Sequence, residues 1–463
     1  MENSQSEQRK PFRRHLRSAA GVALLVAVTL LIFKLYQPRS PALATGSPQP
    51  IDLSNPSQND GATNSDARSP LPLTPPRTAE QIVADKIIVF AAGRREIVHR
   101  LARHYGETIP EEVLRFFDAV EAGNWPETER LFESMAKRSG QYNQSGPPDP
   151  ALNHFWPAVL EAFGVAEQAH DIPAAELLKF GEDVLGAVPP GAVYIGGTDS
   201  GRFIPTLLAE TSSGERPVVL TQNALADSRY LEYIQFLYGD RLDLPNPADS
   251  ERVIAEYKAD ARKRLEHDQQ FPDAPRQVRH LETIKLTGEN IDVSGPTAVM
   301  DVNERFLKLI LERNPDSAFA LQESFPLKGT YAQATPAGPI MELRAPAPAE
   351  PPPAAAPTGA LDYWRNTATQ IRAAPASDET LKNYSHMAGA QGNLLAHQGQ
   401  PAAAEQTYQI SFQLYPGNID TLLNYRRFLL DQQREPEAAR LLDTFRTQHP
   451  DLESELKKWL PPD

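Results

Sequence analysis

The most restrictive feature of this sequence is a spacing of 34 residues that recurs near its C-terminus. Residues of the same or similar type are separated by this interval at four places: Pro416 and Pro450, Ala404 and Ala438, Leu395 and Leu429, and Tyr408 and Leu442. Each unit contains two segments with apolar residues at helical spacing, followed by a proline. A single helical hairpin cannot bury its apolar face alone, so neighbouring units stack. The spacing therefore predicts an all-α domain of stacked hairpins over residues 361–463.

The spacing and residue types in this region resemble tetratricopeptide repeats. The matching positions are Gly392, Leu395, Ala404, Tyr408 and Pro416 in the first copy, and Leu429, Ala438, Leu442 and Pro450 in the second. The second copy departs from the family at Arg426 and Phe445, where small residues are usual. Two copies are fewer than the roughly three that such arrays need, so we expect helices from Leu361 and Asp451 to cover the ends. The resemblance implies binding of a peptide or partner helix; packing against the chain's own residues is the alternative.

An apolar segment near the N-terminus predicts a membrane anchor. Residues 19–36 carry a single charge, Lys34, and follow a basic tail, residues 1–18. The uncharged run is slightly shorter than the ~20 residues that span a bilayer, but Lys34 can snorkel and Tyr36 suits the interface. The basic tail predicts a cytoplasmic N-terminus in the inner membrane, with the rest of the chain outside the cytoplasm. The alternative is a cleaved signal peptide with its cleavage site near Ala44.

Two proline-rich segments divide the remainder of the chain. The sequence contains 43 prolines among 463 residues, more than the usual share of about 5%. Residues 37–78 are rich in Pro, Ser, Asn and Asp without an apolar period, which predicts a disordered tether. Residues 345–360 are denser in proline and predict a stiffer spacer with polyproline II character. These segments leave two bodies to fold, residues 79–344 and 361–463.

The composition excludes several functional classes. A net charge of −14 argues against a nucleic-acid surface, because such a surface needs a basic stripe to displace counterions. The absence of cysteine excludes disulfides, thiolate nucleophiles and cysteine-bound zinc. His99 and His104 are five residues apart and therefore lie on different faces of a helix, so they predict no metal pair. We expect no metal, no cofactor and no catalytic residue.

Residues 79–344 predict helices followed by an alternation of strands and helices. Apolar residues at helical spacing run through residues 80–139 and 154–191. Short apolar runs then predict strands at residues 192–196, 216–224, 318–324 and 338–344. Because the first two strands are each followed by a helical pattern, the region predicts a parallel, Rossmann-like α/β layer.

The stretch YIGGTDSGRF, Tyr194–Phe203, places a glycine turn at the end of the first strand. Ligands of open α/β sheets bind beyond the carboxyl ends of strands, and polar residues follow both of the first two strands. The candidate ligand-binding residues are Thr198, Asp199, Ser200, Arg202, Gln222, Asn223 and Asp227. The turn lacks the lysine and hydroxyl of a phosphate-binding loop, since Arg202 and Phe203 occupy those positions. Such side chains suit a hydroxyl-rich ligand such as a glycan, or a cationic group.

The alternative interpretation of this turn is purely structural. Gly196 and Gly197 then form a tight corner, and Asp199 or Ser200 caps the helix that follows.

The region Ile195–Asp240, together with AFALQESFPL and ATPAGPIMEL, resembles uncharacterised membrane-anchored tetratricopeptide-repeat proteins of the Verrucomicrobia type. More distantly, the order of strand, turn with Gly197, Thr198 and Asp199, helix, strand and polar loop is similar to the soluble tail of protein O-mannosyltransferase-like membrane proteins. This chain departs from the latter by having one hydrophobic segment instead of a multi-spanning core. The resemblance therefore implies a shared accessory domain without shared catalysis.

These features together predict an envelope scaffold that binds protein partners through its helical repeats. The alternative is a glycan-related binding protein or enzyme that uses the polar loops of the α/β domain. We expect contact with the lipid bilayer through residues 19–36 and none with nucleic acid.

Overall fold

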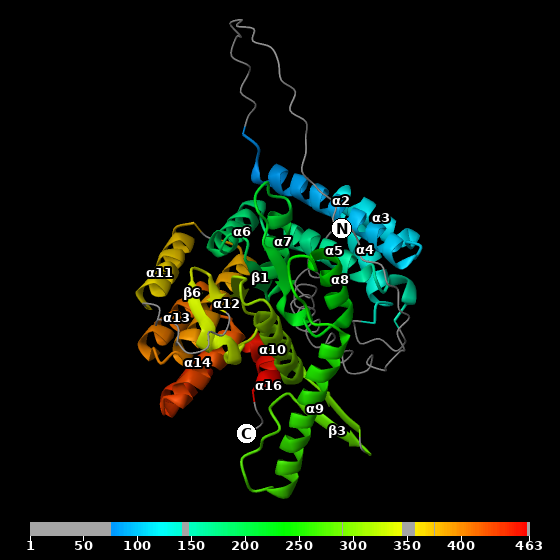
Figure 1. Ribbon diagram of the computed structural model, residues 1–463. Helices are drawn as coiled ribbons and strands as arrows, with labels where there is room; N and C mark the ends of the chain where they lie inside the picture. The colour runs from blue at the N-terminus through cyan, green and yellow to red at the C-terminus, as the bar shows by residue number, and fades with distance from the viewer. Residues whose placement is uncertain (1–75, 141–147, 289, 345–356, 375, 461–463) are drawn as a thin grey trace, which may run out of the picture.

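Helices form most of the described chain, and one small mixed sheet lies between them (Figure 1). The computed structural model describes residues 76–140, 148–288, 290–344, 357–374 and 376–460. The expected tail 1–18, the expected membrane segment 19–36 and most of both proline-rich segments lie outside these residues. Among the helices of the described part, none is both long and apolar enough to cross a membrane.

A block of helices precedes the first strand, as the apolar spacing predicts. Its described α-helices are α2 (Ala79–Tyr105), α3 (Glu111–Glu121), α4 (Trp125–Ala136), α5 (Trp156–Asp171) and α6 (Ala174–Ala187). Thr78 and Gln81 form a reciprocal capping box at the start of α2. Gly106 ends this helix with a φ of 68°, a left-handed conformation that glycine adopts without steric strain. The predicted break between α3 and α4 occurs at Gly123, and Asn124 caps α4.

The central sheet has the strand order β2-β1-β5-β7-β6. Its strands are β1 (Val193–Gly196), β2 (Val218–Thr221), β5 (Phe319–Gln322), β6 (Ala334–Ala337) and β7 (Ile340–Leu343). The strands β2, β1 and β5 are parallel, which confirms the prediction for that half. The prediction of an entirely parallel layer is wrong for β7 and β6, which are antiparallel. Only two residues, Gly338 and Pro339, connect β6 to β7, and a parallel connection needs a dozen or more.

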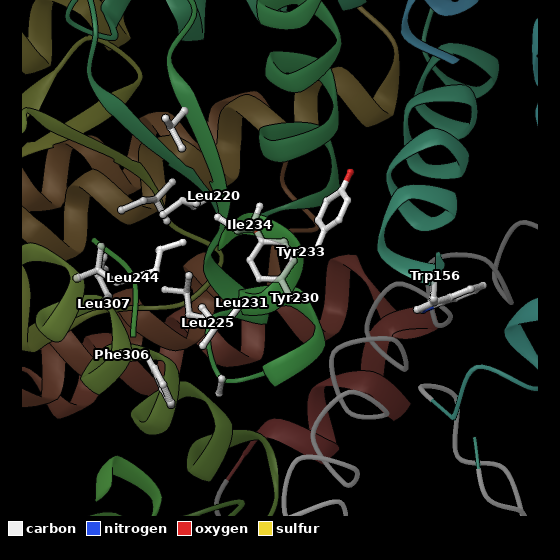
Figure 2. Close-up of a cluster of buried hydrophobic side chains, with 14 of the residues drawn as sticks. Trp156, Leu220, Leu225, Tyr230, Leu231, Tyr233, Ile234, Leu244, Phe306 and Leu307 are labelled. Atoms are coloured by element: carbon white, nitrogen blue, oxygen red, sulfur yellow. The ribbon is translucent and has the colours of Figure 1, made fainter. Parts of the chain in front are cut away.

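Helices cover both faces of this sheet, which explains why the first three residues of each parallel strand are apolar. One face, with Ile195, Leu220 and Leu321, packs against α8 (Ser228–Tyr238) and α10 (Pro296–Arg313). Figure 2 shows part of this core, with Leu220 beside Ile234 and Leu231 of α8. The opposite face, with Tyr194, Val219 and Ala320, packs against α6 and α7 (Asp199–Glu210).

A two-stranded hairpin and a long helix project from the body in Figure 1. The helix is α9 (Pro247–Gln270), and the hairpin consists of β3 (Thr283–Thr287) and β4 (Asn290–Ser294). The sequence analysis did not predict this hairpin. Its signal is an alternation of apolar and polar residues, which pairs Ile284 with Val293 and Leu286 with Ile291 on one side of the ribbon.

The C-terminal region consists of helical hairpins. Its α-helices are α11 (Pro357–Ala373), α12 (Asp378–His397), α13 (Pro401–Leu414), α14 (Ile419–Asp431), α15 (Glu435–Gln448) and α16 (Glu453–Trp459). Five of the residues that carry the 34-residue spacing meet in one buried cluster: Leu395, Ala404, Tyr408, Leu429 and Ala438. Gly392 allows the Tyr408 ring to approach α12, since a Cβ at this position would lie 2.6 Å from the ring. Leu442 is half-buried in a neighbouring cluster, and Pro416 and Pro450 follow α13 and α15.

The first of these hairpins is joined to the sheet by hydrogen bonds from α12. The Gln391 side chain donates to the backbone oxygens of Gly338 and Ile340, at 2.6 and 3.0 Å. The Gln398 side chain donates to the Ala334 oxygen at 2.8 Å on the edge strand β6. In addition, Tyr384 donates to a carboxylate oxygen of Asp183 on α6. The α12 helix therefore covers an edge of the sheet that would otherwise be open to pairing.

Candidate functional site

The glycine turn after β1 leads directly into α7. Thr198 is the N-cap, and its hydroxyl accepts the Gly201 N–H at 2.9 Å. The structural alternative placed this cap on Asp199 or Ser200; the cap lies one residue earlier because Thr198 keeps an extended backbone while Asp199 is already helical. Gly197 lies against the loop after β5: a Cβ there would be 2.2 Å from the Ser324 nitrogen.

The crevice between the ends of β1 and β5 is where the strand order reverses. Such a point is the usual ligand position in an open α/β sheet. In this protein the buried Gln322 side chain fills it, and its Oε1 accepts the N–H groups of Gly197 and Thr198 at 3.0 and 3.1 Å. The backbone donors that elsewhere bind a ligand are therefore already hydrogen-bonded.

Polar side chains from the end of β2 complete the same network. Gln222 accepts the Ser324 N–H at 2.8 Å and donates to the Phe325 oxygen at 3.2 Å. Asn223 donates to the Gly197 oxygen at 3.1 Å and accepts the Ser324 hydroxyl at 2.8 Å. The three strand ends thus hydrogen-bond to one another, which stabilises the turn, and the buried Nε2 of Gln322 is the one amide nitrogen among these side chains that has no partner.

Helix α12, the second helix of the C-terminal region, lies over this crevice. Asn383 donates to the Ser200 hydroxyl at 2.7 Å, and that hydroxyl donates to Gln168 of α5 at 2.5 Å. The His386 Nε2 lies 2.9 Å from the Glu323 backbone oxygen. Residues from three separate parts of the chain therefore close the place where the fold would admit a ligand.

Glu323, at the end of β5, carries a buried carboxyl group. The residue is 2% exposed, and its oxygens accept the Leu327 N–H at 2.9 Å and the Tyr331 O–H at 2.8 Å. Burial raises the pKa of Glu323 to about 8, although these two hydrogen bonds act in the opposite direction. Nothing in the sequence pattern singled out this residue, since a Glu that follows an apolar strand is usually exposed.

A small pocket lies beside the crevice, at the carboxyl end of β2 between α5, α7 and α8. Its volume is about 40 Å³, which admits a few water molecules or a group of similar size. It is lined by Trp156, Pro157, Leu160, Glu161, Arg202, Phe203, Thr221, Ala224, Asp227, Arg229 and Tyr230. Figure 2 shows two of these residues, Trp156 at the start of α5 and Tyr230 on α8.

One side of the pocket belongs to a buried cluster of charges. Arg94 of α2 lies 2.7 Å from Glu161 and forms a bidentate pair with Glu210, at 2.7 Å for both bonds. Tyr233 donates to Glu161, and Tyr238 donates to Glu210. Burial raises the pKa of Glu161, and the nearby Glu210 carboxylate raises it further, while Arg94 and the Tyr233 hydroxyl act in the opposite direction. The pKa of Glu210 is lowered, since the Arg94 guanidinium outweighs its burial.

Two arginines also line the pocket. Arg202 pairs with Asp199 at 2.8 Å, and its guanidinium lies over the Phe203 ring. Arg229 donates to the Ser139 oxygen at 2.9 Å and lies 3.5 Å from Asp227. The Asp227 carboxylate caps α8 by accepting the Arg229 N–H at 2.9 Å.

The structure places five of the seven predicted site residues in the pocket or the crevice and the other two elsewhere. Arg202 and Asp227 line the pocket, Thr198, Gln222 and Asn223 belong to the crevice, Ser200 contacts α12, and Asp199 is paired at the surface. Sequence reasoning missed Glu161, Arg229, Gln322 and Glu323. A signal existed for Glu161, because it is a single carboxylate within an apolar run, Trp156–Val165.

In the described part of the chain, no three His, Asp or Glu side chains gather in a way that would hold a metal ion. No protein-family model, curated protein or solved structure matches this chain.

Proposed function

We propose that this protein is a membrane-tethered adaptor that holds a protein partner outside the cytoplasm through its C-terminal helices. We further propose that α12–α16 are tetratricopeptide-like repeats and that β1, β2 and β5 with α7, α8 and α10 form a Rossmann-like layer. The 34-residue spacing and the buried cluster it creates support the first assignment. Three parallel strands with helices on both faces support the second.

The observation that carries the proposal is a difference between the two helical hairpins: side chains that fix the first one to the α/β body have exposed counterparts in the second. The first, α12 and α13, is fixed to the α/β body by Gln391, Gln398 and Asn383 of α12. The positions of Gln398 and His386 recur 34 residues later as Gln432 and Asp420, which are both exposed. Asp420 of α14 points back to His386, at 3.4 Å, and not to the sheet. The first hairpin would therefore attach the repeats to the α/β body, and the second would bind the partner.

The second hairpin has the charge pattern of a surface made for specific contacts. Arg427 and Asp431 on α14 are exposed and form an i, i+4 pair at 2.9 Å. Arg434, at the start of α15, holds both Glu405 of α13 and Glu437. Charges placed in fixed positions of this kind favour selectivity for one partner over others.

The N-terminal sequence supports the membrane part of the proposal. A basic tail followed by an apolar segment orients a single helix with its N-terminus in the cytoplasm. Residues 37–78 would then act as the tether between that helix and the folded body.

Site-specific photocrosslinking on the full chain tests the adaptor proposal. A crosslinker at Arg427 on α14 should capture a distinct protein in native membranes, whereas the same group at Arg103 on α2, also exposed, should not. The isolated repeats are unsuitable, because they would expose the face of α12 that the sheet covers. The double variant Arg427→Asp with Asp431→Arg keeps the intrahelical pair but inverts its charges, so it should fold and lose the partner. Equal capture at both positions would contradict the proposal.

A second candidate function is binding or modification of a glycan at the strand ends. The observation in its favour is the aromatic lining of the pocket, by Trp156 and Tyr230, next to the polar Thr221 and Asp227. Binding of oligosaccharides by the full chain, without any captured protein, would favour this candidate over the adaptor.

A further inference from the structure

Each of the two arginines of the pocket has a hydrogen-bond donor that no group in the described part of the chain uses. The side chains of Arg202 and Arg229 are 11% and 10% exposed. The Nε of each is buried and has no hydrogen-bond partner. A buried donor without a partner destabilises the folded chain relative to a satisfied one. Both arginines line the same pocket.

Three other arginines with a buried Nε in the described residues differ from this situation, whereas Arg264 and Arg426 share it. The Nε atoms of Arg94, Arg95 and Arg446 also lack a hydrogen bond, but each lies within 3.3 Å of a carboxylate oxygen. Arg202 and Arg229 contact their carboxylates through a terminal nitrogen instead. Their Nε–H groups are consequently left for another acceptor.

The carboxylates around the pocket are already paired with positive charge. Glu161 is held by Arg94 and Tyr233, Asp227 by Arg229 and its own helix, and Asp199 by Arg202. An unpaired Asp199 carboxylate would repel an anion from this turn, but its pairing with Arg202 neutralises that charge. Arg202 and Arg229 also lie in the first turns of α7 and α8, where the helix ends add positive potential.

We infer that this pocket binds a small free oxyanion, a phosphate or a short carboxylate, whose oxygens accept the Nε–H groups of Arg202 and Arg229. Guanidinium groups bind planar or tetrahedral oxyanions through several hydrogen bonds at once. The volume of about 40 Å³ is of the size expected for such a small group. Thr221 adds a hydroxyl group to the pocket wall.

Thermal unfolding of the full chain with added anions tests this inference. Inorganic phosphate and acetate are compared with sodium chloride at equal ionic strength, so that screening is the same. At ten times its dissociation constant, a bound anion should raise the unfolding midpoint by roughly 2 °C. A rise with phosphate, with acetate or with both supports the site and identifies the preferred class of anion.

Variants test whether the rise in the unfolding midpoint depends on the two arginines. The double variant Arg202→Gln with Arg229→Gln should lose the rise. The matched control is Arg426→Gln, because Arg426 on α14 also has a buried Nε without a hydrogen bond but lies outside the pocket; it should respond as the natural chain does. Absence of any rise with both anions, or a rise that survives in the double variant, would overturn the inference.

A second measurement covers the case in which the double variant does not fold. Trp156 lines the pocket, so its fluorescence should respond to the anion, and Trp156→Phe should remove that response while keeping the thermal shift. The single variant Arg229→Lys keeps the charge but lacks the fork of donors, and it should bind the anion about tenfold more weakly, a loss of roughly one charge-assisted hydrogen bond. An unchanged affinity in Arg229→Lys would count against the proposed contact.

Discussion

The crevice between β1 and β5 and the pocket beside β2 lie at the same end of the sheet but differ in how their polar groups are used. In the crevice, Gln322 and Gln222 take up the backbone N–H groups of the turn and of the loop after β5. In the pocket, Arg202 and Arg229 keep donors without partners. The backbone donors of the crevice are therefore part of the folded core, where one amide nitrogen, the Nε2 of Gln322, has no partner. The pocket instead brings together two charged side chains with unpartnered donors, which is where we infer that an external acceptor binds.

This comparison shows that the position of a strand end does not by itself identify a ligand site. The order β2-β1-β5 marks the crevice as the expected location. The amide side chains and α12 close it, so the protein uses this location to hold its C-terminal helices. The pocket in which we infer binding lies one strand further out, at the end of β2.

The largest expected effect comes from placing a methyl group in the crevice. In Gly197→Ala, the new Cβ would lie 2.2 Å from the Ser324 nitrogen and 2.4 Å from Gln222 Oε1, so the strand ends must separate. We expect a loss of about 3 kcal/mol or more in the free energy of unfolding. The control is Gly93→Ala on α2, where no atom lies within 4 Å and alanine should stabilise the helix by about 0.5–1 kcal/mol. Urea unfolding compares the two; similar stability in both variants would show that the crevice is not closely packed.

An intermediate effect should appear as a pH dependence at Glu323. The folded chain raises the pKa of this carboxyl from 4.5 to about 8. Between these values the folded state binds more protons than the unfolded state, so the stability falls as the pH rises. The slope from this group approaches about 1.4 kcal/mol per pH unit.

The variant Glu323→Gln keeps an acceptor for the Leu327 N–H and cannot ionise. It should lose this part of the slope when urea unfolding is measured from pH 5 to pH 8. The control Glu133→Gln, at an exposed position on α4, should keep the slope of the natural chain. If Glu323→Gln also keeps it, the buried carboxyl does not titrate in this range.

The smallest effects distinguish the cap from the surface ion pair in the turn. Thr198→Ala removes the N-cap of α7 and should cost about 1 kcal/mol. Asp199→Asn removes only the pair with Arg202, in which the Asp199 side chain is 39% exposed, and should change stability by less than about 0.5 kcal/mol. Chemical unfolding of both variants checks the order. A larger loss in Asp199→Asn would mean that Asp199, and not Thr198, holds the helix start.

Local sequence signals predicted the elements well where the pattern is strong. The glycine at position 123, the apolar periods of α2 to α6 and the run Val218–Leu220 correspond to breaks, helices and a strand in the structure. The antiparallel half of the sheet was not predicted, because its direction depends on the short turn at Gly338 and not on the apolar character of β7. The pairing partner of a strand is a long-range property that a local pattern does not contain.

The candidate site was predictable only in part, for a similar reason. Arg202 and Asp227 follow the two strands directly, so the sequence indicated that they lie near each other. Glu161 reaches the pocket from α5, and Asn383 reaches the crevice from α12, through packing between elements far apart in the chain. Sequence alone also assigned Asn223 and Asp227 to one cleft, whereas the 3₁₀ turn Gln222–Ala224 directs Asn223 towards Gly197.

Nuclear magnetic resonance of the arginine side chains during a phosphate titration tests the comparison most directly. The full chain is labelled so that the Nε–H signals of arginine and the backbone signals of glycine and threonine are resolved. The account predicts that the Nε–H signals of Arg202 and Arg229 shift in a saturable way, while the backbone signals of Gly197 and Thr198 stay in place. Shifts at Gly197 and Thr198 with unchanged arginine signals would contradict it, because the ligand would then occupy the crevice.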